Sequence, residues 1–226
     1  MSQTHLAFPL YAYPGQAEFN RVLPKSKIYE HGRPTRAVRD YFVSQVNQIV
    51  WQHKLAPETI NLPARTGVPE IEIFSIELKT PEVSEDVLRC IDKAIPLPIF
   101  YNLIFDGRIK TVAAYKRPSD ADASRWVVGD YFESSWLPAK SERTVLPVAL
   151  DMAGLYEQML RRLMPQPART GETLKDHVER LSHLRCKQTE YSKLKAKLNM
   201  EKQFNRKVEI NHNLRRIQIE IEELIS

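Results

Sequence analysis

Residues 172–226 contain neither glycine nor proline, although the whole chain carries 7 Gly and 15 Pro. Because these two residues are the strongest breakers of a helix, their absence predicts a helical tail that continues to Ser226. The pattern fits a single long helix and a helical hairpin equally well. Apolar residues recur in the second half of the tail at steps of four and three, the spacing of a coiled-coil seam: Ile210, Leu214, Ile217, Ile221 and Leu224.

The first half of the tail carries its own line of apolar residues: Leu174, Val178, Leu181, Leu184, Tyr191, Leu194 and Leu198. A long helix with one apolar side needs a partner to cover that side. We therefore expect the tail to pair with itself, with a second copy of the chain or with another protein.

The rest of the chain divides into an arm, a body and a linker. Residues 1–35 are rich in proline and aromatic residues and lack periodicity. They predict an extended N-terminal arm with a short helix near 18–22. Residues 36–164 form the body, and the proline-bearing segment 165–171 is a linker that separates it from the helical tail at 172–226.

The body alternates between helical and strand-like patterns. In chain order the expected elements are a helix at 35–53, a strand at 70–79, a helix at 82–95, strands at 99–105, 109–116 and 126–136, and a helix at 151–164. Asp106-Gly107, between two of these strands, is a strong hairpin signal. The prediction is an α+β fold with a mixed or antiparallel four-stranded sheet and flanking helices, followed by the long helical or coiled-coil tail.

Hydrophobic residues make up 42% and charged residues 27% of the chain, which is typical of a soluble globular protein. Cys90 and Cys186 lie in helical patterns and cannot build a disulfide framework, so we expect a reducing compartment. Residues 1–24 lack the features of a secretory signal, and no apolar run is long enough to span a membrane. We expect a cytoplasmic protein without a membrane partner.

Lys and Arg total 33 against 28 Asp and Glu, a net charge of +5, and the tail holds more than half of this excess. A basic helix can face nucleic acid or an acidic protein, although such a face is most often simply solvated. Asn205, Arg206 and Asn211 can also form a polar layer that sets the register of paired helices, and the pattern favours that interpretation. The candidate residues for binding a partner or nucleic acid are Lys193, Lys197, Phe204, Asn205, Arg206, Lys207, Asn211, Arg215 and Arg216.

Glu77 and Lys79 flank one spacer residue at the end of a predicted strand, as in nucleases of the PD-(D/E)xK type. In those enzymes carboxylates hold a divalent metal and the lysine stabilises charge, all on one side of the strand. A metal-binding Asp on a preceding strand is missing, and Glu58, Glu70 and Glu72 are poor substitutes. Glu77 and Lys79 are therefore only fallback catalytic residues, and the sequence leans against an enzyme.

Metal and cofactor signals are weak throughout. His183 and Cys186 supply at most two ligands, whereas a structural zinc site needs four. The chain also lacks the glycine-rich nucleotide-binding motifs and the nucleophile motif of α/β-hydrolases. We expect neither a metal nor a cofactor.

Five blocks of the sequence carry a family resemblance: Asn20-Arg21-Val22-Leu23-Pro24-Lys25, Leu55-Ala56-Pro57-Glu58-Thr59-Ile60-Asn61, Ile71 to Lys79, Ile91-Asp92-Lys93-Ala94-Ile95-Pro96, and Glu201 to Asn211. The chain resembles the bacterial domain-of-unknown-function family numbered four-three-nine-one over nearly its whole length. Such proteins look like companions of helicases and DNA methyltransferases in restriction or phage-defence loci. The resemblance implies an accessory role and supplies no catalytic residues.

We therefore expect a non-catalytic accessory or interaction protein of a bacterial DNA-processing or restriction-type phage-defence system. Its partner would be helicase or methyltransferase machinery, or a second copy bound through the tail, and DNA is a further candidate. The alternatives are a metal-dependent nuclease that uses Glu77 and Lys79, and a DNA-binding subunit.

Overall fold

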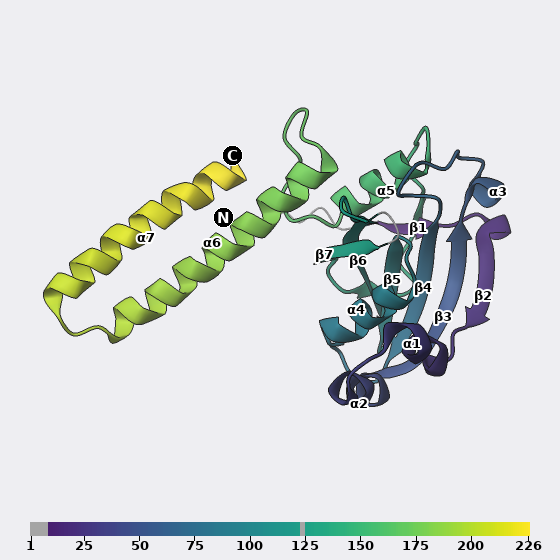
Figure 1. The fold of residues 1–226 in the computed structure, drawn as a ribbon, viewed down its shortest axis with the longest axis horizontal. Helices are drawn as coiled ribbons and strands as arrows, with labels where there is room; N and C mark the ends of the chain where they lie inside the picture. The colour runs from purple at the N-terminus through teal and green to yellow at the C-terminus, as the bar shows by residue number, and fades with distance from the viewer. Residues whose placement is uncertain (1–8, 123–124) are drawn as a thin grey trace. The chain divides into compact units, whose positions relative to one another are not determined.

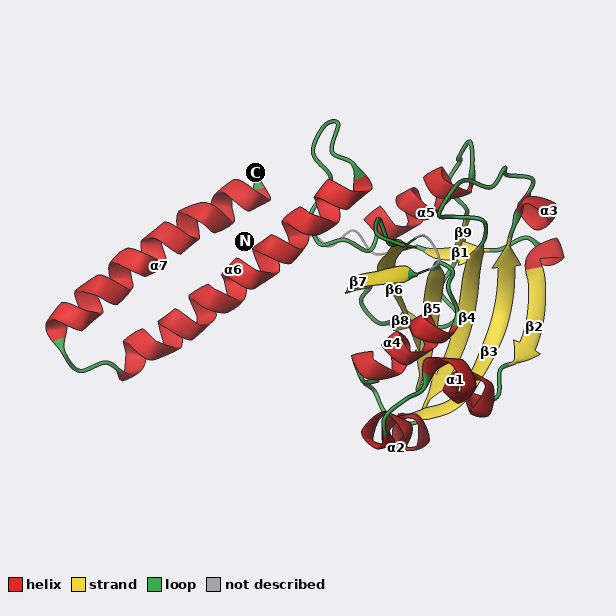
Figure 2. Cartoon of the chain, in the orientation of Figure 1, coloured by secondary structure: helices red, strands yellow, loops and turns green. Residues whose placement is uncertain are grey.

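The computed structural model describes residues 9–122 and 125–226. The chain divides into two compact units, unit 1 up to Pro165 and unit 2 from Gln166. Figures 1 and 2 draw the helices and strands of the two units. Each unit has its own buried apolar side chains. Among the described residues, no helix is both long and apolar enough to cross a membrane.

Unit 1 is built on a seven-stranded sheet. Its strands are β2 (Glu18–Val22), β3 (Val46–Leu55), β4 (Ile71–Leu78), β5 (Ile99–Phe105), β6 (Arg108–Pro118) and β7 (Trp126–Glu133), in that spatial order, with β8 (Leu137–Pro138) paired to β6. The pair β4–β5 is parallel and the other pairs are antiparallel, so the sheet is mixed. A second, parallel sheet pairs β1 (Leu10–Ala12) with β9 (Arg143–Val145).

The predicted α+β class is confirmed, but the prediction of four strands is wrong because the sheet has seven. Residues 18–22 form β2 in place of a short helix, and the helix expected at 35–53 ends at Gln45, where β3 takes over. The register of β3 shifts near Val46 and again near Trp51. Such bulges leave Val46 and Ile49, three residues apart, both buried in one core, and this spacing imitates a helix.

The predicted hairpin at Asp106-Gly107 is confirmed. The two residues join β5 to β6 and have φ values of 47° and 68°. This turn requires positive φ at both positions, which Asp tolerates and Gly adopts freely. The signal was strong because it depends on local backbone geometry alone.

Helices cover both faces of the sheet (Figure 1). On one face lie α1 (Lys25–Gly32), α2 (Arg36–Gln45) and α4 (Glu85–Ala94), which pack with the strands in one core. Gly32 permits the close approach of α1 to α4, since a Cβ there would lie 2.6 Å from the carbonyl oxygen of Cys90. On the other face lies α5 (Met152–Arg161), whose Tyr156 meets Phe100 edge-to-face with ring centroids 6.0 Å apart. A short helix, α3 (Pro57–Ile60), follows β3.

Unit 2 is a helical hairpin made of α6 (Leu174–Met200) and α7 (Phe204–Ile225) (Figure 2). This observation decides between the two forms of the tail that the sequence left open. The chain turns without glycine or proline because Oε1 of Glu201 accepts hydrogen bonds from the backbone N–H groups of Lys202 and Gln203. A side chain that captures nearby backbone donors in this way competes with helix continuation.

Candidate functional site

The hairpin closes on one apolar seam, which we call the inner seam. From α7 it uses Ile210, Leu214 and Ile217, and from α6 it uses Val178, Leu181 and Leu184; all six are buried. The residues on α7 are those that the heptad spacing predicts, so the seam pairs the two helices of one chain.

Arg180 closes the open end of the hairpin. Its guanidinium donates to both carboxylate oxygens of Glu172, with Nε–Oε1 at 2.6 Å and Nη2–Oε2 at 2.9 Å, and to the carbonyls of Pro167 and Leu224. The contact with Leu224 caps the last carbonyls of α7, whose C-terminus favours a cation. The hydrogen bonds from Arg180 hold the pKa of Glu172 at about 2. Sequence reasoning missed this cluster of contacts, because two of the four hydrogen bonds from Arg180 go to backbone carbonyls.

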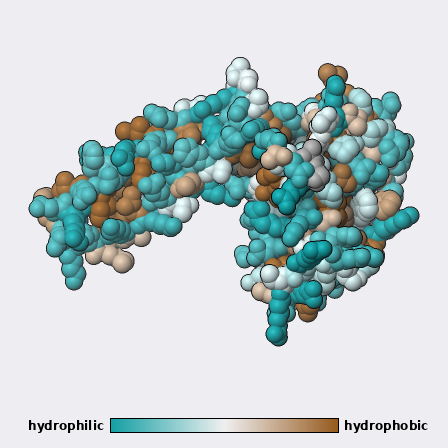
Figure 3. All heavy atoms as spheres, in the orientation of Figure 1, coloured by the Kyte–Doolittle hydropathy of each residue, from teal (hydrophilic) through white to brown (hydrophobic). Residues whose placement is uncertain are grey.

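The turn end of the hairpin is open. Residues 204–209, the first turns of α7, are all exposed, and packing against α6 begins only at Ile210. Three large apolar side chains near the turn are exposed by 79%, 77% and 53%: Met200, Phe204 and Val208. We call these three residues the tip patch. Figure 3 shows hydrophobic atoms among hydrophilic ones on the surface of the hairpin.

Cations surround the tip patch. Between residues 191 and 209 the exposed basic side chains outnumber the acidic ones, Glu201 and Glu209, by six to two: Lys193, Lys195, Lys197, Lys202, Arg206 and Lys207. The turn end of the hairpin therefore combines an exposed aromatic and aliphatic surface with positive charge.

All nine residues predicted to bind a partner or nucleic acid lie exposed on the hairpin: Lys193, Lys197, Phe204, Asn205, Arg206, Lys207, Asn211, Arg215 and Arg216. The structure gathers most of them near the turn. Arg215 and Arg216 lie further along α7, where Nε of Arg216 is 3.9 Å from Glu220. Because Asn205 and Asn211 are exposed, they form no polar layer between α6 and α7.

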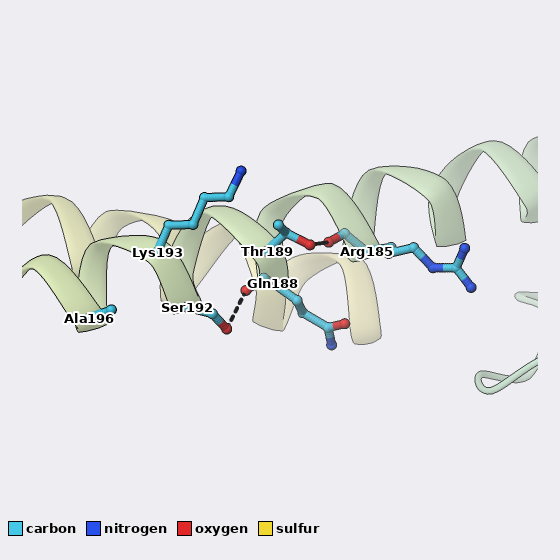
Figure 4. A pocket seen from close by; sticks show the side chains of 6 residues that line it. All are labelled: Arg185, Gln188, Thr189, Ser192, Lys193 and Ala196. Carbon is cyan, nitrogen blue, oxygen red and sulfur yellow. Dashed lines mark hydrogen bonds between the residues drawn. The ribbon is translucent and has the colours of Figure 1, made fainter.

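A shallow hollow runs along one face of α6 (Figure 4). It is lined by Arg185, Gln188, Thr189, Ser192, Lys193 and Ala196. The hollow exists because its middle residues are small, and the hydroxyls of Thr189 and Ser192 donate to carbonyls one turn back on the helix, at 2.9 Å each. Both hydroxyl groups are therefore hydrogen-bonded to the backbone of their own helix.

Glu77 and Lys79, the fallback catalytic residues, have structural contacts. Oε2 of Glu77 accepts a hydrogen bond of 2.8 Å from Nδ2 of Asn47, and its register neighbours in the sheet are Gln48 and Ile104. Nζ of Lys79 donates to the carbonyl of Val43 at 2.8 Å, near the end of α2. A lysine in that place caps a helix C-terminus.

Candidate metal ligands do not gather in the part of the chain that the structure describes. No three His, Cys, Asp or Glu side chains there are placed to hold an ion. His183 and Cys186 are both exposed on α6. The nuclease hypothesis thus gains no observation in its favour from these residues.

Sequence reasoning missed a buried ion pair in unit 1. Nζ of Lys116 on β6 lies 3.0 Å from Oδ1 of Asp92 on α4, and both side chains are almost fully buried. The hydroxyl of Tyr131 donates to Oδ2 of the same carboxylate. Burial raises the pKa of Asp92 and lowers that of Lys116. A signal existed, because Asp92 follows Leu88 and Ile91 in the buried stripe of its helix.

The second missed group is Glu72 on β4, which is fully buried. Its Oε2 accepts a hydrogen bond of 2.6 Å from Nε1 of Trp51. Burial raises its pKa to about 8. The sequence predicted a strand at 70–79 whose apolar residues fall on both faces, which is the pattern of a strand covered on two sides.

The fold and the surface define an α+β protein that carries a helical hairpin with an apolar, basic turn end. The model of the family described as "Domain of unknown function (DUF4391)" matches residues 12–221. The chain therefore belongs to this family, as the resemblance of its sequence blocks implied. No curated protein and no solved structure matches the chain.

Proposed function

We propose that the protein is a non-catalytic accessory subunit that joins a larger bacterial DNA-processing or phage-defence assembly through its hairpin. One observation carries the proposal: the tip patch exposes a Phe, a Met and a Val side chain on a helical pair whose own seam lies elsewhere. Contiguous patches of exposed apolar side chains are typical of surfaces that bind other molecules.

The physical gain from covering the tip patch is appreciable. Burying apolar surface contributes about 25 cal/mol per Å², and aromatic side chains supply the strongest contacts in many interfaces. The surrounding lysines and arginines add long-range attraction for an acidic partner and speed its encounter. The chemistry of the turn end thus favours a partner with an acidic surface and an apolar centre.

Unit 1 supports this role as a platform. Both faces of its sheet are covered by helices, and Asp92, Lys116 and Glu72 are enclosed in its interior. Partner binding by the hairpin therefore requires no change in that interior.

The direct experiment compares the full chain with a chain that lacks residues 172–226. Each is used to capture the helicase or methyltransferase machinery that the family resemblance implies. We expect the full chain to retain the partner and the shortened chain to lose it. The shortened chain must keep the Trp fluorescence of folded unit 1, which holds Trp51, Trp126 and Trp136. Retention of the partner by the shortened chain would contradict the proposal.

A second function, direct binding of DNA, has one observation in its favour: the excess of exposed cations around the turn. Phosphate contacts of this kind release counterions, so affinity falls steeply with salt. We expect any duplex affinity of the full chain to fall about tenfold or more between low and moderate salt. Replacement of Arg206 and Lys207 by Gln would lower the salt slope. An interaction that is absent or insensitive to salt would reject DNA binding.

A further inference from the structure

The methionines that the structure describes differ strongly in exposure. Met152, Met159 and Met164 lie in α5 and just after it, and they are 0%, 0% and 8% exposed. Met200 is 79% exposed and is the one exposed methionine among the described residues, which do not include Met1. A small reagent dissolved in water therefore reaches the thioether of Met200, while the folded core of unit 1 shields the other three.

The end of α6 fixes the exposure of Met200. Met200 is the last residue of this helix, and the backbone N–H of the next residue, Glu201, donates to the carbonyl of Lys197 at 3.0 Å. Three residues separate Met200 from Phe204, where α7 begins. The thioether thus projects from an ordered helix end into the tip patch, which it forms with Phe204 and Val208. Methionine is common in binding surfaces because its side chain is flexible and polarizable.

We propose that Met200 is an oxidation site at which hydrogen peroxide converts the tip patch from an apolar to a more polar surface. In this reaction the sulfur lone pair forms a bond to one oxygen of the peroxide, and the O–O bond breaks. The other oxygen takes the proton and leaves as water, so sulfur loses the two electrons that the peroxide gains. The product is methionine sulfoxide, a polar group that reductases return to the thioether.

The consequence for binding rests on the proposed function of the tip patch. A thioether covered by a partner gains free energy from apolar contact, whereas a sulfoxide must give up hydrogen bonds to water to enter the same contact. Loss of the contribution of one methionine side chain corresponds to a fall in affinity of about tenfold or more. Oxidation therefore weakens partner binding and leaves the inner seam, which does not include Met200, as it is.

Cys186 is a second exposed sulfur on α6. It precedes Met200 by fourteen residues, which at 1.5 Å of helix rise per residue places it about 21 Å away along the axis. Because peroxide also oxidises thiols, the test uses the full chain with Cys186→Ser. Met200 is then the one exposed sulfur among the described residues.

The first test needs no partner. The C186S chain is treated with hydrogen peroxide under native conditions, and each methionine is followed by peptide mass mapping. We expect Met200 to gain an oxygen before Met152, Met159 and Met164, and the oxidised native chain to elute earlier from a hydrophobic-interaction column. The same chain with Met200→Leu should keep its elution time after treatment. Equal oxidation of all four methionines, or a shift that M200L retains, would overturn the inference.

Capture of the helicase or methyltransferase machinery then tests the consequence for binding. We expect the oxidised chain to bind about tenfold more weakly than the untreated chain, enzymatic reduction of the sulfoxide to restore binding, and treated M200L to keep it. Undiminished capture by a chain oxidised at Met200 would overturn the inference and leave the proposed function standing. No capture by the untreated chain would overturn the proposed function and with it the effect on binding, whereas the mass and elution results would still decide the selective oxidation of Met200.

Discussion

The two units differ in where they place charged and apolar residues. Unit 1 encloses a charged pair within its core, since Asp92 and Lys116 are 2% and 1% exposed and lie 3.0 Å apart, although Val148 and Leu150 on one of its loops are exposed. Unit 2 buries one seam and leaves Phe204 and Val208 exposed by 77% and 53%. The lysines and arginines near its turn are exposed as well, whereas Arg180 at the other end is buried.

The contrast indicates which part of the chain offers a surface for binding. Buried polar groups that satisfy one another contribute to the specificity and stability of a fold. Exposed apolar groups contribute nothing to the stability of an isolated chain and gain free energy only when something covers them. The proposed function therefore treats unit 1 as a platform and assigns partner binding to the exposed turn end of unit 2.

The largest effect is expected inside unit 1. Asp92→Ala leaves the Lys116 ammonium buried without its counter-ion, so the free energy of unfolding should fall by about 3–5 kcal/mol. Trp fluorescence in urea measures this change, because all three Trp residues lie in unit 1. The double change of Asp92→Leu with Lys116→Met should recover most of the loss. A single variant as stable as the wild type would mean that the pair is not enclosed as described.

Next comes the inner seam of the hairpin. Leu214→Ala removes a buried side chain from a single seam, and we expect a loss of about 2–3 kcal/mol, near the lower end for such changes. On heating, the helix content measured by circular dichroism should be lost at a lower temperature than in the wild type. The Trp fluorescence of unit 1 should stay unchanged. Parallel loss of both signals would show that the units do not unfold independently.

The stability of unit 1 should also depend on pH through Glu72. Its pKa of about 8 lies above the ordinary value of 4.5, so the folded state holds a proton that the unfolded chain releases. The free energy of unfolding should therefore fall as pH rises between about 5 and 8, by up to about 1.4 kcal/mol per pH unit. Glu72→Gln should remove this slope. An identical slope in the variant would assign the pH dependence to other groups.

The smallest effect on stability is expected at the tip patch. Phe204→Ser with Val208→Ser removes exposed apolar groups, so the free energy of unfolding should change by no more than about 0.5 kcal/mol. Circular dichroism of the variant is compared with that of Leu214→Ala on the same helix. A large loss of helix would mean that these side chains stabilise the hairpin from within.

The sequence predicted the elements whose signals are local. The heptad spacing found the inner seam, Asp106-Gly107 found the turn of a hairpin, and the strand at 71–78 was marked by its dense β-branched residues. The helix expected through His53 failed because bulges in β3 spoil the alternation of a strand. The turn at Glu201 could not be located from the sequence, because α6 ends through hydrogen bonds to a glutamate side chain and not at a glycine or proline.

The residues of the candidate surface could be predicted from the sequence, but their exposure and their positions in the fold could not. The basic and apolar residues near Phe204 were evident, but their exposure depends on where the packing of α6 and α7 begins. The buried pair of Asp92 and Lys116 joins residues distant in sequence, and only the fold brings them together. Glu72 likewise depends on its neighbours across the sheet.

The claim that the tip patch binds a partner is tested most directly by capture with the full chain carrying Phe204→Ser and Val208→Ser. The control is Val43→Ser, which changes a valine on unit 1 that is 63% exposed. We expect the tip variant to keep its helix content but to lose the partner captured by the wild type, while the control retains it. Undiminished capture by the tip variant would show that the tip patch does not bind the partner.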